Sequence, residues 1–196
     1  MLKVATAAML LLLGACSSPS SEPGTGPAQK TSQPAPAAAD APPSELSSPK
    51  PAPAVLLSPD GLVAAGRLLR FGIPRAEIEA EISAAQGAAT DRGSSSECGA
   101  GTIDFTSYKD GLQLTFQDGK FAGWTINAAA SPLKTAKGIG IGSTRQELDA
   151  AFADLTVEDS SLGLLFSSGD LTGLLDIDGI EGLVTDIWAG TVCLID

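Results

Sequence analysis

In the stretch Leu112-Gln113-Leu114-Thr115-Phe116-Gln117-Asp118-Gly119-Lys120-Phe121-Ala122-Gly123, large apolar residues alternate with polar or small residues on both sides of an Asp-Gly pair. Alternation with a period of two is typical of a strand that buries one face. Asp118-Gly119 favours a two-residue turn, because both central residues of such a turn need positive φ angles. The stretch therefore predicts a β-hairpin, and the rest of the fold can be worked out from it.

The turn fixes the register of this hairpin. With a two-residue turn, Phe116 lies opposite Phe121 and Leu114 lies opposite Gly123, so these side chains share one face. Trp124 then falls on the other face, which predicts that another part of the protein covers it.

A second hairpin is predicted downstream of the first. Its apolar and glycine positions match those of the first hairpin at a constant offset of 50 residues; they are Leu162, Leu164, Phe166, Gly169, Leu171 and Gly173. Self-similarity of this kind indicates an internal repeat.

Each hairpin is preceded by a segment typical of a helix start. Residues 71–80 and 141–150 align with each other at an offset of 70 residues. Pro74 suits a first helical turn, where a missing N–H costs nothing. Thr144 and Glu147 have the spacing of a capping box, in which each side chain binds the other residue's backbone N–H. Apolar residues then fall on one helix face in each copy; they are Ile78, Ile82 and Ala85, and Leu148, Phe152 and Leu155.

These elements predict the fold class. Closing strands are expected near 103–108 and 184–188, where apolar and β-branched residues cluster. The sequence thus predicts one α+β domain over 55–196, with an internal repeat at about 68–127 and 138–193. Each repeat is expected to be a helix plus an antiparallel hairpin, with the helices packed on one face of an antiparallel sheet.

The N-terminus has the features of an export signal. Lys3 precedes an apolar run over 4–13, which is too short to span a bilayer. Leu13-Gly14-Ala15-Cys16 resembles the lipobox of bacterial lipoproteins. The resemblance implies that 1–15 is a cleaved signal peptide and that Cys16 is the anchor residue, with a diacylglyceryl group on its thiol and an acyl chain such as palmitate on its amine. An ordinary secretory signal with a chance cysteine is the alternative.

Residues 16–54 are rich in Ser, Pro and Ala and have almost no large apolar side chains. Such a segment buries too little surface to offset its ordering entropy, so we expect a disordered tether between Cys16 and the domain. Ser17 follows the lipidated cysteine in place of the aspartate that retains some lipoproteins at the inner membrane. We therefore expect a cell-envelope protein anchored through lipid, at the outer membrane facing the periplasm if the cell is Gram-negative.

The charge of the chain excludes one class of partner. The formal net charge is −11, and the chain after Arg145 contains eleven acidic residues and no Lys or Arg. An acidic surface repels phosphate backbones, so we expect no nucleic-acid binding.

Two cysteines remain once Cys16 is lipidated. An even number in an oxidising compartment predicts a disulfide between Cys98 and Cys193. Residues 191–195 around Cys193 look like a terminal strand. A nucleophilic Cys98 is the rival interpretation, but it would need a nearby base, and the chain has no histidine.

Two groups of residues are candidates for a ligand site. Asp176, Asp178 and Glu181 offer three carboxylates within six residues, as a Ca²⁺ site would require, although Asp178 before a glycine also suits a hairpin turn. Trp124 and Trp188 are candidates for a binding surface that stacks carbohydrate or peptide, and they suit a core equally well.

The mature region is also similar to known proteins. Over about 68–193, the order of elements and the glycine before each helix resemble the β-lactamase-inhibitor proteins and the small lipoproteins of outer-membrane protein assembly. The resemblance and the absence of a catalytic set of residues imply a non-catalytic module that binds an envelope protein partner or serves in envelope assembly, with no cofactor beyond the lipid on Cys16. The alternative is an acidic periplasmic protein or enzyme that binds a small ligand or Ca²⁺.

Overall fold

The computed structural model describes residues 55–194. The expected signal peptide at 1–15, the lipidation of Cys16 and the tether at 16–54 lie outside the described residues. Within 55–194, neither helix has the length and apolar character needed to span a bilayer.

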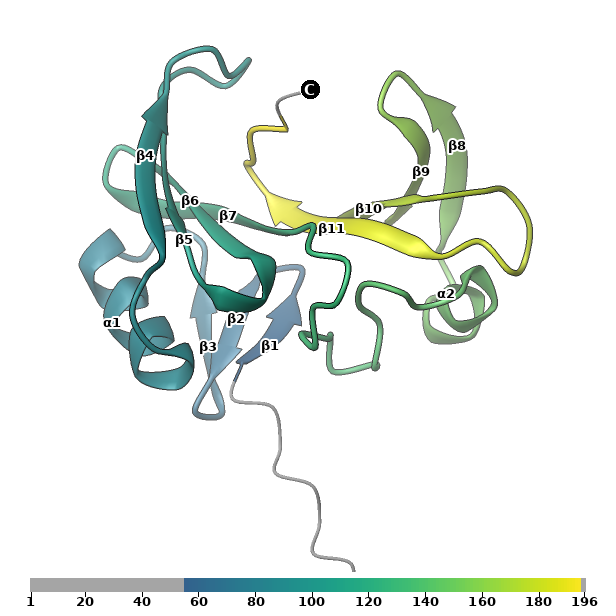
Figure 1. Cartoon of the computed structure of the whole chain (residues 1–196), viewed down its shortest axis with the longest axis horizontal. Coiled ribbons are helices and arrows are strands. Elements are labelled where there is room, and N and C mark those ends of the chain that lie inside the picture. The colour runs from purple at the N-terminus through teal and green to yellow at the C-terminus, as the bar shows by residue number, and fades with distance from the viewer. Residues whose placement is uncertain (1–54, 195–196) are drawn as a thin grey trace, which may run out of the picture. The chain divides into compact units, whose positions relative to one another are not determined.

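The described residues form mostly antiparallel β-structure (Figure 1). In chain order the elements are β1 (Val55–Ser58), β2 (Gly61–Ala64), β3 (Arg67–Arg70), α1 (Arg75–Gln86), β4 (Asp91–Ser95), β5 (Ile103–Ser107), the 3₁₀ turn η1 (Lys109–Gly111), β6 (Leu112–Gln117), β7 (Lys120–Ile126), α2 (Arg145–Ala151), β8 (Thr156–Ser160), β9 (Gly163–Ser168), β10 (Leu171–Leu175) and β11 (Val184–Gly190).

The predicted α+β fold, with two helix-plus-hairpin repeats and helices packed on one face of a sheet, is wrong. The described part of the chain has eleven strands in two sheets and only two helices. A three-stranded sheet, β1-β2-β3, precedes the first helix, and each helix is followed by four strands in place of a hairpin. The polar strands β4 and β8 lack the alternation of apolar residues that would have revealed them, since most of their side chains are exposed.

The larger sheet has eight antiparallel strands in the order β4-β5-β6-β7-β11-β10-β9-β8. Strands β7 and β11 join its two halves, with Trp124 paired with Ala189 and Thr125 with Trp188. Figure 1 shows the three-stranded sheet beneath the middle of this sheet, flanked by α1 and α2. The first helix contacts both sheets through β1, β2 and β7. One face of the eight-stranded sheet is therefore covered, by the three-stranded sheet together with the two helices.

The β6–β7 hairpin is confirmed, but its register differs from the prediction beyond the turn. Asp118 and Gly119 both have positive φ angles (52° and 72°), as a two-residue turn requires, and Phe116 pairs with Phe121. Next to this pair the register shifts, so that Leu114 pairs with Trp124 and not with Gly123. The shift is a β-bulge, which adds one residue to β7 and changes the face of every side chain after it.

The bulge brings the apolar residues of both strands to the covered face. Trp124 is fully buried, and its indole Nε1 donates a hydrogen bond to the backbone oxygen of Ser58 at 3.0 Å. Because Ser58 belongs to β1, this bond ties the three-stranded sheet to the eight-stranded one. The core between the sheets also contains Leu57, Leu62, Leu69, Leu112, Leu114, Phe116 and Phe121.

The helix starts are confirmed, and the second helix is shorter than its pattern suggested. Thr144 accepts a hydrogen bond from the backbone N–H of Glu147 at 3.1 Å, and the Glu147 carboxylate accepts one from the N–H of Thr144 at 2.8 Å. This is the predicted capping box. The helix ends at Ala151, so Phe152 and Leu155 pack against the core from the following loop and not from a helix face.

Candidate functional site

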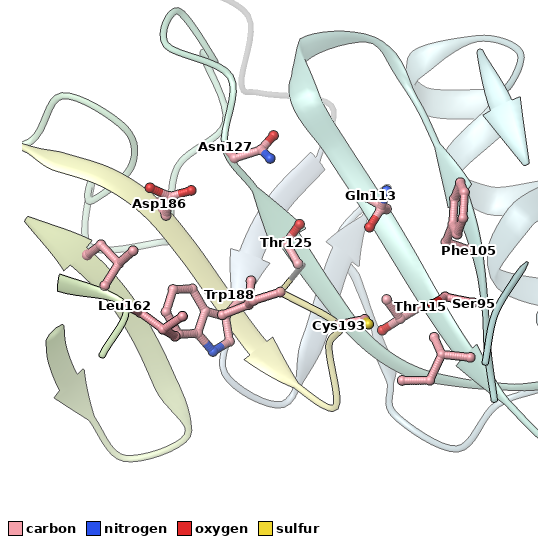
Figure 2. A pocket seen from close by; sticks show the side chains of 13 residues that line it. Ser95, Phe105, Gln113, Thr115, Thr125, Asn127, Leu162, Asp186, Trp188 and Cys193 are labelled. Carbon is pink, nitrogen blue, oxygen red and sulfur yellow. The ribbon is translucent and has the colours of Figure 1, made fainter. Parts of the chain in front are cut away.

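The uncovered face of the eight-stranded sheet contains an open groove with a volume of about 380 Å³ (Figure 2). Strands from both halves of the sheet contribute to it. Its lining combines aromatic and aliphatic groups with amides, hydroxyls and a carboxylate; the residues are Ser95, Ile103, Phe105, Gln113, Thr115, Thr125, Asn127, Leu162, Leu174, Asp186, Trp188, Cys193 and Leu194.

The strand register sets one row of side chains across the floor of the groove. Gln113 in β6 pairs with Thr125 in β7, and Thr125 pairs with Trp188 in β11. Directly paired residues of antiparallel strands point to the same face, so these three side chains lie side by side. Figure 2 shows them together in the groove. Trp188 is mostly buried, with 8% of its surface exposed, and its exposed part belongs to this floor.

A carboxylate lies beside this row. Asp186 precedes Trp188 by two residues in β11, so both side chains project from the same face, about 7 Å apart along the strand. Asn127 follows the end of β7 and lies near Asp186 at the mouth of the groove (Figure 2). No ion pair among residues 55–194 involves Asp186. Among the described lining residues it is the one charged side chain.

The C-terminal segment closes one end of the groove. The backbone N–H of Thr191 donates to the oxygen of Ala122 at 2.8 Å, and the hydroxyl of Thr115 donates to the oxygen of Thr191. A Cβ on Gly123 would collide with that same backbone oxygen, so a side chain there would block the crossing. The prediction of a strand over 191–195 is wrong for its described residues, because β11 ends at Gly190.

A cysteine pair holds this segment in place. Cys98 and Cys193 lie at disulfide distance, with 5.6 Å between their Cα atoms, as the sequence predicted. Cys98 lies between β4 and β5, so the pair connects an edge of the sheet to the C-terminal segment over the groove. Cys193 and Leu194 consequently form part of the lining.

The two tryptophans proposed as one binding surface lie on opposite faces of the sheet. Trp124 is in the core, and Trp188 lines the groove. The structure therefore does not bring their indoles together, and only Trp188 is available to a ligand on the uncovered face.

The proposed metal ligands lie in the loop between β10 and β11. Asp176 accepts a hydrogen bond from the N–H of Leu183 at 2.7 Å, and Asp178 accepts one from the N–H of Gly179 at 2.7 Å. Both carboxylates thus stabilise the loop, and Glu181 is exposed on it. Within 55–194, no group of three or more His, Cys, Asp or Glu side chains is placed to hold a metal ion. Calcium binding by this loop stays a prediction.

A second cavity, of about 520 Å³, lies between the β1–β2 hairpin and the loop around Phe152. The basic side chain in its lining, Lys137, already has two partners within the protein. Its ammonium group donates a hydrogen bond to the backbone oxygen of Ala151 at 2.7 Å and lies 4.5 Å from the ring centroid of Phe152.

Asp60 and Asp154 in the lining of this second cavity also have partners, Arg70 at 3.9 Å and the hydroxyl of Ser168 at 2.6 Å, and Asp170 is exposed. We place the candidate site in the groove, because its lining combines an aromatic side chain with amides, hydroxyls and a carboxylate.

Most of the groove was missed from the sequence. Gln113 and Thr115 are outward positions of the alternating pattern in the first hairpin, so their position on the uncovered face was predictable. Asp186 and Asn127 become neighbours only through the β7–β11 pairing, which joins segments far apart in the chain. Comparison of the chain with protein-family models, with curated proteins and with solved structures gave no match in any of the three.

Proposed function

We propose that this chain is a lipid-anchored envelope protein whose domain binds a segment of a partner protein in the groove around Trp188, without catalysis. The observation that supports the proposal is the composition of the groove, in which an aromatic anchor is surrounded by hydrogen-bonding groups. Aromatic residues at the centre of a surface and polar groups at its rim are typical of protein-binding sites.

The form of the groove favours a chain segment over a buried small molecule. The groove is partly open to solvent, and it takes its lining from both halves of the sheet. Amide and hydroxyl groups along it, such as those of Gln113, Thr125 and Asn127, can pair with the backbone of an extended segment. The apolar side chains of Phe105 and Leu174 provide surface for its side chains.

Catalysis has less support than binding. The whole chain contains no histidine, which removes the commonest general base and the usual activator of a serine or threonine hydroxyl. The groove lining offers one carboxylate, Asp186, whereas glycoside hydrolysis, for example, uses a pair.

The N-terminal sequence supports the anchored part of the proposal. The lipobox-like Leu13-Gly14-Ala15-Cys16 and the Pro- and Ser-rich segment after it suit a domain held near a membrane by a long tether. Tethering raises the effective concentration of the domain for partners in the same membrane, so modest affinity for the groove is sufficient.

Site-specific crosslinking tests the proposal. A photoreactive amino acid is placed at Leu162, which lines the groove and is 36% exposed, in the chain expressed in its own host. The matched control places it at Asp159 in β8. Val157 lies two residues before Asp159 in this strand and packs against the core, so the side chain of Asp159 also projects from the covered face.

The proposal predicts one dominant adduct with an envelope protein from position 162 and none from position 159. The adduct should also disappear when Gln113→Arg narrows the groove. Adducts of equal yield from both positions, or no adduct from position 162, would contradict a protein-binding groove.

A further inference from the structure

We infer that the partner segment presents an arginine to the groove, whose guanidinium pairs with Asp186 while its aliphatic stem packs on Trp188. This inference rests on the proposed function and specifies the chemistry of the partner. Three features of the groove support it: the position of the carboxylate beside the indole, the charge around it, and the amides at its mouth.

The geometry matches a long side chain with a charged end. Asp186 and Trp188 project from the same face of β11 at a spacing of about 7 Å. Long cationic side chains pack their methylene stems on apolar surface and keep their charged ends in a polar environment. Trp188 offers the apolar surface and Asp186 the charge, so one arginine can contact both.

Charge complementarity selects a cation. The described groove lining contains no Lys or Arg, and the chain after Arg145 contains none. Through the pairs Asp186–Leu174, Leu174–Leu165 and Leu165–Glu158, the register places Glu158 on the same face as Asp186. Two carboxylates on one face with no basic side chain in the lining give this half of the sheet a negative potential.

The neighbouring amides favour arginine over lysine. The side-chain oxygens of Asn127 and Gln113 line the groove on either side of Thr125 and can accept hydrogen bonds. A guanidinium has five N–H donors in a planar fork and can serve a carboxylate and an amide together, whereas an ammonium acts as a compact point charge.

The test is an NMR titration that uses the two tryptophans of the chain as probe and internal control. The ¹⁵N-labelled lipidated chain in detergent micelles gives two indole N–H signals, one from Trp188 in the groove and one from Trp124 in the core. The probe is an acetylated and amidated Gly-Ser-Arg-Ser-Gly peptide. The matched probes carry citrulline, which has the shape of arginine without its charge, or lysine.

The arginine peptide should shift the Trp188 signal in a saturable manner and leave the Trp124 signal unchanged. The citrulline peptide should bind about fivefold more weakly, the change expected for loss of one exposed ion pair. Asp186→Asn should remove this difference, whereas Asp159→Asn, with the same loss of charge on the opposite face, should preserve it. Binding of the arginine peptide should also weaken with added salt.

Equal affinities for the arginine and citrulline peptides, equal affinities for arginine and lysine, or no shift of the Trp188 signal would each overturn the inference. If crosslinking from Leu162 still captures a partner in that case, the protein-binding function stands and only its arginine specificity falls. If crosslinking captures none, the function itself falls.

Discussion

Leu114 lies opposite Trp124 across β6 and β7, one residue beyond the position that a regular hairpin register would give it. The bulge that causes this shift turns Trp124 toward the three-stranded sheet, where its indole binds Ser58. Without it, both tryptophans would project from the uncovered face. The bulge therefore separates a tryptophan that holds the two sheets together from one, Trp188, whose small exposed part lines the groove.

Trp124→Phe tests this division of roles. The substitution removes the hydrogen bond to Ser58 and leaves a cavity between the sheets, so the free energy of unfolding should fall by about 2 to 4 kcal/mol. Urea denaturation measures the change, and groove binding by the folded protein should remain. A loss below about 0.5 kcal/mol would show that Trp124 does not join the sheets.

The bond between Cys98 and Cys193 should stabilise the fold by restricting the conformations of the unfolded chain. Cys98 and Cys193 are separated by 95 residues, and closing a loop of that length contributes about 4 to 5 kcal/mol in the chain-entropy treatment. Replacing both cysteines by serine should lower the unfolding free energy by up to this amount. Hydrogen exchange should at the same time show loss of protection at Thr191, whose N–H binds Ala122. Unchanged stability and protection would contradict the role assigned to the pair.

Acid should destabilise the protein through Glu79, which joins α1 to β5. Burial raises the pKa of Glu79, but hydrogen bonds from Thr106 (2.6 Å) and Arg75 (3.0 Å) and the charges of Arg75 and Arg92 outweigh it, so the net pKa is lowered. A carboxyl group with a lowered pKa in the folded state stabilises the protein fully above its unfolded pKa. That contribution is lost as the pH falls through its folded pKa.

Unfolding free energy measured from neutral to acidic pH should therefore fall less steeply for Glu79→Gln than for the wild type. Glu158→Gln, on an exposed edge strand, is the matched control and should follow the wild-type curve. Parallel curves for wild type and Glu79→Gln would show that this carboxylate does not contribute to acid sensitivity.

Gln86 is a site where the protein can be stabilised. The residue is buried at the end of α1, and its side-chain oxygen Oε1 has no hydrogen-bond partner among the described residues. An unsatisfied buried acceptor costs about 1 to 3 kcal/mol. Gln86→Met has similar length and no such acceptor, so it should raise the unfolding free energy by about 1 kcal/mol. A destabilised variant would mean that the amide forms a bond that Met cannot replace.

The sequence predicted the features that depend on local chemistry. The Asp118-Gly119 turn and the capping box of Thr144 and Glu147 were predictable because short-range backbone requirements select those residue types. The pairing of Cys98 with Cys193 followed once Cys16 was set aside as the expected lipidation site, because two cysteines then remain.

The features that depend on long-range pairing could not be predicted. The residue pattern does not mark the bulge before Gly123, because the bulge depends on how β7 packs against the facing sheet. Strands β4 and β8 are exposed and polar, so they show no apolar period, and the strands of the three-stranded sheet have four residues each. The groove depends on the β7–β11 pair, so only its outward positions in β6 were open to prediction.

The affinity of the crosslinked partner for groove variants tests the central claim most directly. Its dissociation constant is measured for the wild type, for Gln113→Trp, which fills the groove, and for Asp159→Trp, which adds the same bulk on the opposite face. A binding groove predicts at least about tenfold weaker binding, or about 1.4 kcal/mol, for Gln113→Trp and wild-type binding for the control. Unchanged affinity of the Gln113→Trp variant would contradict the claim that partners bind in the groove.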